Sequence, residues 1–216
     1  MILSNFYKRL YTSLVLILLI LLIFNFNFIL TYCLLVCGVL AVIEFFNISK
    51  NLLLNFLVKY LINIFFIIYI FTFCFYFLFF ANISGLKIIL FILLSACVAS
   101  DIGGFLFGKI FKGPKLTKIS PKKTYSGSLG SIFFSVIAVL ILSVFFDIFI
   151  NFKLIAFAIL TSIFCQIGDL FFSFLKRKAK LKDTGNILPG HGGILDRVDG
   201  LLLGIPLGFL TFVILN

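Results

Sequence analysis

The chain has 216 residues, of which 63% are hydrophobic and 12% are charged. This composition excludes a soluble globular protein and is typical of a protein that crosses a membrane several times. The net charge of +11 does not indicate nucleic-acid binding, because the basic residues are distributed as membrane topology requires. The five cysteines lie inside apolar segments without a CxxC pair and are interpreted as small core residues.

Seven apolar segments follow one another along the chain. Each has about the length that a helix needs to cross a bilayer, and the runs are continuous rather than alternating, which favours helices over a barrel. The predicted fold class is therefore all-α, a polytopic membrane protein with two polar cytoplasmic loops. The first segment is interpreted as a retained anchor because it lacks a small-residue cleavage site. The predicted spans cover residues 10–29, 30–47, 60–81, 86–107, 128–149, 153–172 and 200–215.

The basic residues predict the orientation of these spans. With the N-terminus in the cytoplasm, all but two of the 18 Lys and Arg residues fall in cytoplasmic segments, the exceptions being Lys87 and Lys153. The positive-inside rule favours this orientation, and the expected location is the inner, cytoplasmic membrane of a bacterium. Both large polar loops, residues 108–127 and 173–199, then lie on the same side of the membrane and can form one site.

Small residues recur at every fourth position in two of the spans. Such stripes let helix backbones approach closely in lipid, so they are interpreted as packing surfaces. They consist of Ala96, Ser100, Gly104 and Gly108 in one span and of Gly200, Gly204 and Gly208 in the last.

The seven acidic residues are the minority among the charges. Asp101 lies about two turns before the cytoplasmic end of its span, and Asp169 about one turn before the end of its own. An unpaired carboxylate is costly in a membrane, so both are candidate functional residues, with a buried ion pair to a lysine as the alternative. For Glu44, inside the second span, and Asp147, near the outer end of the fifth, structural hydrogen bonding is predicted.

The richest polar stretch runs from residue 173 to 200 and contains the only histidine, His191. Its glycines and Pro189 prevent a continuous helix between residues 184 and 193. The stretch is interpreted as a basic helix end, a glycine-rich loop and a new helix that begins at about Asp196. Ionised side chains beside a bilayer core need water, a partner or a ligand, so this stretch is predicted to be a functional site or its edge.

Two helices around this loop carry the candidate ligands. Asp196 and Asp199 share a face in the first turn of the last helix, where the helix dipole favours carboxylates. Together with Asp169 they would form a set of oxygen ligands, which suits Mg²⁺ rather than zinc. The preceding helix has one face with an acceptor at membrane depth and donors toward the cytosol, formed by Gln166, Asp169, Ser173, Lys176 and Lys180.

The other cytoplasmic loop carries five lysines between residues 112 and 123. Hydroxyl and glycine residues follow where the fifth span begins, and amides at a helix N-terminus can hold a phosphate. The alternative is that the lysines reflect only topology and contact with lipid headgroups. The residues concerned are Thr124, Ser126, Gly127, Ser128 and Gly130.

The residues from 173 to 199 resemble the full signature of the phosphatidate cytidylyltransferase family, also called CDP-diacylglycerol synthases. Seventeen positions match at fixed spacing over 27 residues: Ser173, Leu175, Lys176, Arg177, Lys182, Asp183, Gly185, Leu188, Pro189, His191, Gly192, Gly193, Ile194, Asp196, Arg197, Val198 and Asp199. Further family motifs are similar to Asp101, Gly108, Ser120, Pro121, Lys123, Thr124, Gly127, Gly130 and the triplet 168–170. The resemblance covers about residues 95–205. The chain is accordingly divided into N-terminal spans, 1–94, and a catalytic region, 95–216, within one integrated membrane domain.

The resemblance implies transfer of the cytidylyl group of CTP to phosphatidic acid, with release of pyrophosphate, in phospholipid biosynthesis. It implies one or two Mg²⁺ ions, and the expected partners are CTP, phosphatidic acid and membrane lipids, with a homodimer left open. Metal binding is expected of Asp169, Asp196 and Asp199, and further catalytic roles of Ser173, Lys176 and His191. Substrate binding is expected of Arg177, Lys182, Asp183, Gly192, Gly193, Arg197, Lys123, Thr124 and Asp101.

The sequence departs from the family pattern at Ser126 and Phe172, where members often carry glutamate, so no role of those glutamates carries over. One alternative function is a related CTP-dependent lipid enzyme, such as a polyprenol kinase, which would release CDP instead of pyrophosphate, or a synthase for a different lipid. A membrane transporter would also place carboxylates inside its helices. The charges here gather on one side of the membrane and no inverted repeat is visible, which disfavours a transporter.

Overall fold

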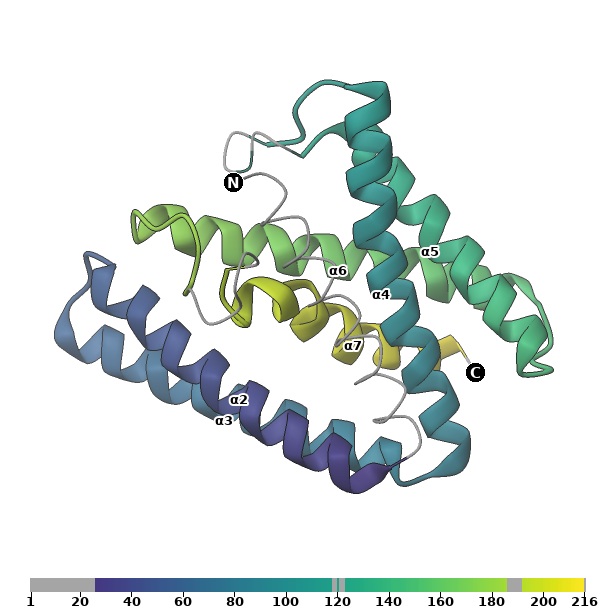
Figure 1. The fold of residues 1–216 in the computed structure, drawn as a ribbon, viewed down its shortest axis with the longest axis horizontal. Helices are drawn as coiled ribbons and strands as arrows, with labels where there is room; N and C mark the ends of the chain where they lie inside the picture. Colours follow the sequence, from purple (N-terminus) through teal and green to yellow (C-terminus); the bar gives the residue numbers. More distant parts are fainter. Residues whose placement is uncertain (1–25, 118–119, 121–122, 186–191, 216) are drawn as a thin grey trace, which may run out of the picture. The chain divides into compact units, whose positions relative to one another are not determined.

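The computed structural model describes residues 26–117, 120, 123–185 and 192–215. Within these residues it contains six long α-helices (Figure 1). Each is long and apolar enough to cross a membrane, which confirms the predicted class of an all-α, polytopic membrane protein. The helices are α2 (Asn27–Asn51), α3 (Phe56–Ala81), α4 (Ser84–Phe111), α5 (Tyr125–Phe145), α6 (Phe152–Lys178) and α7 (Leu195–Leu215).

The six described helices correspond to the last six predicted spans. The first predicted span, residues 10–29, lies mostly outside the described residues, so the count of seven stays a prediction.

The helices are mostly longer than the apolar segments that predicted them. Hydropathy marks the lipid-facing stretch, whereas helical hydrogen bonding continues into polar sequence until the backbone turns away. Thus α6 runs on to Lys178, and Lys180 adopts the left-handed conformation with φ 56°.

The break between α6 and α7 confirms the helix, loop and helix predicted for the C-terminal polar stretch, with α7 beginning at Leu195. The break between α4 and α5 has an equally local cause. Lys112, just after α4, has φ 44°, and Thr124 forms the N-cap of α5 by accepting a hydrogen bond from Gly127 N at 3.1 Å.

The chain divides into two compact units. The first comprises Met1–Asn82 and Lys178–Arg197, and the second comprises Ile83–Arg177 and Val198–Asn216. The boundary between residues 94 and 95 rests on the family motifs and not on packing, and it stays a prediction. The loop after α6 belongs to the same unit as the N-terminal helices, although the two are distant in sequence.

In the first unit, α2 and α3 pack side by side as a helical hairpin (Figure 1). The rings of Phe45 and Phe66 stack with their centroids 3.8 Å apart. Near the start of α2 and the end of α3, Asn27 Nδ2 donates a hydrogen bond to Asn82 Oδ1 at 3.0 Å. The pair is thus held by aromatic packing along its length and by an amide contact at one end.

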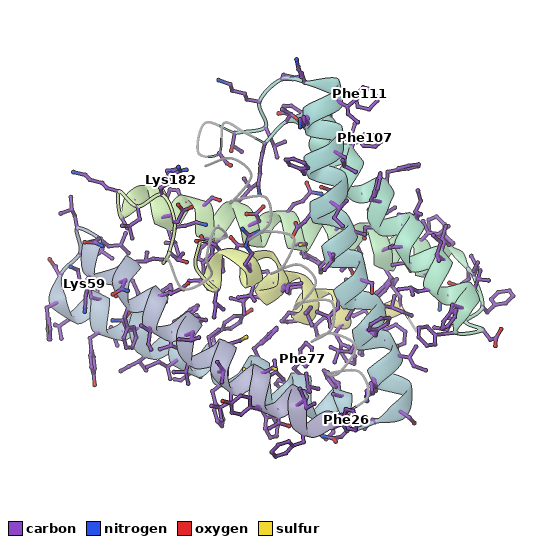
Figure 2. All side chains as sticks on the ribbon, in the orientation of Figure 1. Phe26, Lys59, Phe77, Phe107, Phe111 and Lys182 are labelled. Carbon is purple, nitrogen blue, oxygen red and sulfur yellow. The ribbon has the colours of Figure 1, made fainter. Side chains whose placement is uncertain are left out.

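Large apolar side chains are exposed along the described helices (Figure 2). Phe26 and Phe111, both labelled in Figure 2, and Phe56 are examples. In water, so much exposed apolar surface would favour association with other molecules. Lipid tails are as apolar as these side chains, so the same surface is well accommodated in a bilayer.

In the second unit, a buried apolar cluster joins α4, α5 and α6. Ser135 Oγ on α5 donates a hydrogen bond to the Ala158 carbonyl on α6 at 3.1 Å, so the helices are also tied by a polar contact. The cluster consists of Ile92, Leu93, Ala96, Val139, Phe157 and Ala158.

The small-residue stripes are packing surfaces, as predicted. A Cβ atom added at Gly104 would lie 2.6 Å from Ser131 Oγ on α5. On α7, a Cβ at Gly204 would lie 2.8 Å from Cys97 Sγ, and one at Gly208 would lie 2.6 Å from Leu93 Cδ2. Each distance is shorter than van der Waals contact, so glycine is what allows these helices to come together.

The variant Gly130→Ala should destabilise the protein by about 1–3 kcal/mol, because its Cβ would overlap the side chain of Phe107 and the carbonyl of Gly103. Thermal unfolding of the purified protein in detergent measures the effect. The matched control is Gly85→Ala, since a Cβ there meets nothing within 4 Å. Equal melting temperatures for the two variants would contradict the packing argument.

Candidate functional site

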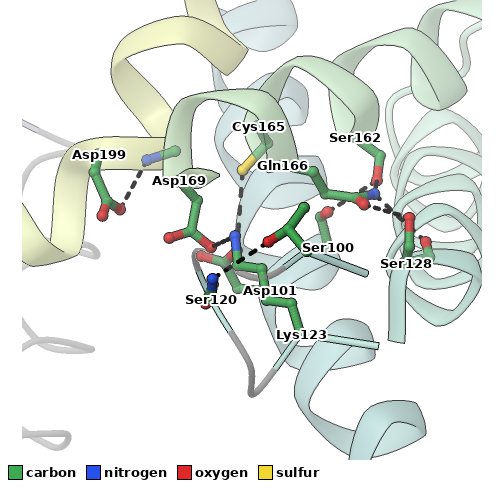
Figure 3. A network of polar contacts seen from close by, with 12 residues as sticks. Ser100, Asp101, Ser120, Lys123, Ser128, Ser162, Cys165, Gln166, Asp169 and Asp199 are labelled. Atoms are coloured by element: carbon green, nitrogen blue, oxygen red, sulfur yellow. Dashed lines mark hydrogen bonds and ion pairs between the residues drawn. The ribbon is translucent and has the colours of Figure 1, made fainter. Parts of the chain in front are cut away.

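Two oppositely charged pairs lie along one face of α6. Asp169 and Lys176 are two helical turns apart and so point to the same side. Asp169 forms an ion pair with Lys123, which Figure 3 shows reaching it from the loop before α5. Lys176 Nζ lies 3.6 Å from Asp199 Oδ2 on α7. Asp169 and Asp199 therefore each have a lysine beside them, and for Asp169 this is the ion pair that the sequence offered as an alternative.

Backbone hydrogen bonds hold Lys123 in place. Its N–H donates to the Ser120 carbonyl at 3.0 Å, and its carbonyl accepts from Leu116 N at 2.8 Å. The next residue, Thr124, was predicted to bind substrate, and in the structure its hydroxyl caps α5. The ammonium of Lys123 is thus presented by a loop whose backbone is fixed on both sides.

Ser126, one of the two departures from the family pattern, closes this loop. Its Oγ accepts a hydrogen bond from Gly113 N at 3.2 Å and lies 3.0 Å from Thr124 Oγ1. Ser126 therefore joins the end of α4 to the start of α5. A serine at this position has a structural role of its own.

Asp199 is buried where α6 and α7 come together. Its Oδ1 accepts a hydrogen bond from Gly200 N at 2.9 Å. A Cβ at Gly168 would lie only 2.7 Å from the Asp199 carbonyl, so this glycine lets the two helices approach. The carboxylates of Asp101 and Asp169 act on Asp199 electrostatically. Lys176 acts in the opposite direction and offsets part of this repulsion.

A chain of polar side chains runs through the second unit beside Asp169 (Figure 3). Ser100 Oγ and Ser162 Oγ are 2.8 Å apart, and Gln166 Nε2 donates to Ser162 Oγ at 3.2 Å. Ser128 Oγ in turn donates to Gln166 Oε1 at 2.5 Å. The chain joins α4, α6 and α5 one turn from Asp169, so it fixes the helix that carries the two ion pairs.

Asp196 lies in the first turn of α7 and belongs to the first unit. Its Oδ2 accepts hydrogen bonds from Thr184 N at 2.8 Å and Gly193 N at 3.2 Å. Gly192 has φ 83°, a left-handed conformation that favours glycine, and a Cβ there would lie 3.2 Å from the same oxygen. The described residues at both ends of the loop thus close on the Asp196 carboxylate.

The remaining predicted site residues are less enclosed, and His191 lies outside the described residues. Ser173 is half-buried on α6, and Asp101 is exposed and accepts a long contact from Cys165 Sγ at 4.0 Å. Within the described part of the chain, no group of three or more His, Cys, Asp or Glu side chains is close enough to hold a metal ion. The other exposed members of the set are Arg177, Lys182, Asp183 and Arg197.

The model of the Cytidylyltransferase family matches residues 51–215, which is more than half of the chain. The chain belongs to this family. Proteins named phosphatidate cytidylyltransferase are similar to it in Staphylococcus epidermidis (42% identity over 125 residues, 57% of this chain and 48% of the relative) and Staphylococcus aureus (43% over 125 residues, 57% and 48%). A protein of the same name in Rickettsia typhi is 42% identical over 130 residues, 56% of this chain and 57% of the relative. The chain spans about half the length of the curated relatives it matches.

Sequence reasoning assigned Thr184 no role, yet this residue contacts the Asp196 carboxylate. The structural hydrogen bonding predicted for Glu44 is confirmed, and its partners lie in the same loop and at the start of α7. Thr184 is buried and uses both its N–H and its hydroxyl there. A threonine in a glycine-rich loop gives no distinctive sequence signal. For Glu44 a signal was present, since it is a lone carboxylate in an apolar span.

Replacing Lys176 with methionine should destabilise the protein by about 3 kcal/mol, because Asp199 would stay buried without its lysine. The double variant with Asp199→Asn should recover part of this loss. Lys153→Met is the matched control, since Lys153 is exposed at the other end of α6. Chemical unfolding in detergent compares the four proteins, and equal effects at positions 153 and 176 would contradict the buried pair.

Proposed function

We propose that this protein transfers the cytidylyl group of CTP to phosphatidic acid, giving CDP-diacylglycerol and pyrophosphate. The observation that carries the proposal is that α6 takes part in two ion pairs. Asp169 pairs with Lys123, and Lys176 pairs with Asp199. Such pairs can exchange partners when a substrate brings both phosphates and a divalent cation. Membership of the Cytidylyltransferase family and relatives named phosphatidate cytidylyltransferase support this reaction class.

The reaction makes modest demands on the protein. A phosphate oxygen of phosphatidic acid attacks the α-phosphorus of CTP, and the bond from that phosphorus to the bridging oxygen breaks as pyrophosphate leaves. The nucleophile is already anionic, so positioning and charge neutralisation matter more than a strong base. Lys123 and Lys176, released from their carboxylates, would bind phosphate oxygens.

The carboxylates fit Mg²⁺ by their chemistry, since they are hard oxygen donors, and Asp169 acts electrostatically on Asp199. Asp169 and Asp199 would hold it, with Asp196 one turn earlier on α7, and a second ion is left open. The ion would supply charge neutralisation at the phosphates.

The remaining predicted residues surround the substrates in this proposal. The exposed basic residues Arg177, Lys182 and Arg197 would neutralise the triphosphate. Gly192 and Gly193 would form the loop over the nucleotide with His191, which positions it, and Ser173, Thr124, Asp101 and Asp183 complete the polar surroundings. The site would face the cytoplasm from the inner membrane, with the acyl chains of the substrate in lipid.

The variant Asp169→Asn should lower cytidylyl transfer by at least about a hundredfold, since it removes a carboxylate proposed to hold the metal ion. The measurement is pyrophosphate release by the purified protein with CTP, Mg²⁺ and phosphatidic acid, omitting each in turn. Asp147→Asn, beyond the far end of α5, is the control and should keep full activity.

Three other outcomes would contradict the proposal. Unchanged pyrophosphate release by Asp169→Asn would remove Asp169 from the site. Release of CDP instead of pyrophosphate would indicate a CTP-dependent lipid kinase. Intact CTP with the folded wild-type protein would favour a transporter.

A further inference from the structure

Glu44 is a carboxylate inside α2, the first described helix, and its side chain is 1% exposed. Within the described residues, it accepts three hydrogen bonds from a segment 140 to 151 residues away. Thr184 Oγ1 donates to Oε2 at 2.6 Å, Ile194 N to Oε1 at 2.9 Å, and Leu195 N to Oε2 at 2.8 Å. All four residues belong to the first compact unit.

These hydrogen bonds satisfy two costly requirements at once. A buried carboxylate in an apolar span is unfavourable unless donors surround it. The first N–H groups of a helix have no partner within that helix, and the helix dipole favours negative charge there. Ile194 and Leu195 stand at the start of α7, so Glu44 caps α7 from a different helix.

Thr184 links Glu44 to the predicted metal ligand Asp196. The Thr184 hydroxyl has a single proton and lies 2.6 Å from Glu44 Oε2 and 3.0 Å from Asp196 Oδ2. The shorter distance assigns the proton to Glu44. Glu44 therefore orients Thr184, whose own N–H holds Asp196.

Two glycines of the family signature enclose the same carboxylate. A Cβ at Gly185 would lie 2.8 Å from Glu44 Oε1, and one at Gly193 would lie 2.7 Å from Glu44 Cδ and would overlap Thr184 Oγ1. Both ends of the loop thus close on Glu44. These contacts explain why glycine is needed at both positions, independently of any bound nucleotide.

We propose that Glu44 is a positioning residue for the glycine-rich loop: it fixes the start of α7 and, through Thr184, the carboxylate of Asp196. Glu44 would touch neither substrate nor metal. Its consequence for catalysis rests on the proposed function, whereas its effect on the loop does not.

The loop is tested directly by trypsin digestion of the full-length protein in detergent. Glu44→Gln keeps the size of the side chain but replaces one acceptor oxygen with a donor that would face an N–H group or the Thr184 hydroxyl. Cleavage after exposed Lys180 should become at least about tenfold faster, because the loop opens more often. Cleavage after exposed Lys115, in the other polar loop, is the internal reference and should not change.

The matched control is Ser49→Ala, which is buried on the same helix and donates to the Phe46 carbonyl. It should leave cleavage after Lys180 at the wild-type rate. Equal rates for Glu44→Gln and the wild type would overturn the proposal. If Glu44→Gln does not fold, Thr184→Val removes the shared hydroxyl from the loop side, and it must also accelerate cleavage after Lys180.

Pyrophosphate release gives a second readout that a purely structural role would not move. Loss of folded protein lowers the apparent kcat and leaves the Mg²⁺ requirement unchanged. A displaced Asp196 also raises the Mg²⁺ concentration that gives half of the maximal rate. Glu44→Gln should show at least about a fivefold rise in that concentration. An unchanged Mg²⁺ requirement would overturn the link to Asp196. If the wild type itself releases no pyrophosphate, the proposed function fails, and the trypsin rates still decide the role of Glu44.

Discussion

The cost of placing a charged group in an apolar medium governs this structure. Three carboxylates in the described helices meet that cost in two ways. Asp169 and Asp199 are paired with lysines, so each carboxylate and each lysine can give up its partner for a charged group of a ligand. Glu44 is surrounded instead by backbone and hydroxyl donors, so its charge is committed to the fold. The same physical demand thus separates residues suited to binding from a residue suited to holding a loop.

Close helix packing makes the paired charges possible. Gly168 brings the Asp199 backbone against α6, and Gly200 brings α7 close to Cys165. In lipid, apolar burial contributes little to helix association, so the approach depends on small residues and polar contacts. The chain of hydrogen bonds through Gln166 then fixes α6 against α4 and α5. Helices held in this way, together with the loop that carries Lys123, can keep two lysines and two carboxylates in place.

The N-terminal helices do more than anchor the chain. The family resemblance covers the later part of the sequence, and the earlier spans match the family only in being hydrophobic. In the structure, however, the glycine-rich loop packs in the same unit as α2 and α3. Through Glu44, α2 accepts hydrogen bonds from the N–H groups of Ile194 and Leu195 at the start of α7. The loop that carries most of the signature is therefore held by a residue that the signature does not contain.

The sequence by itself determined the helices, the glycine-rich break before α7 and the packing stripes. Lipid forces each span to satisfy its own backbone, so local hydropathy and composition are enough to find it. It also pointed to Asp169, Lys176 and Asp199 through helical spacing and family resemblance. Only the tertiary structure decided that Lys123 pairs with Asp169, that Ser126 closes its loop, and that Glu44 holds the segment around Thr184. Those contacts join parts of the chain that no periodicity connects, up to 151 residues apart, and they depend on how the helices pack.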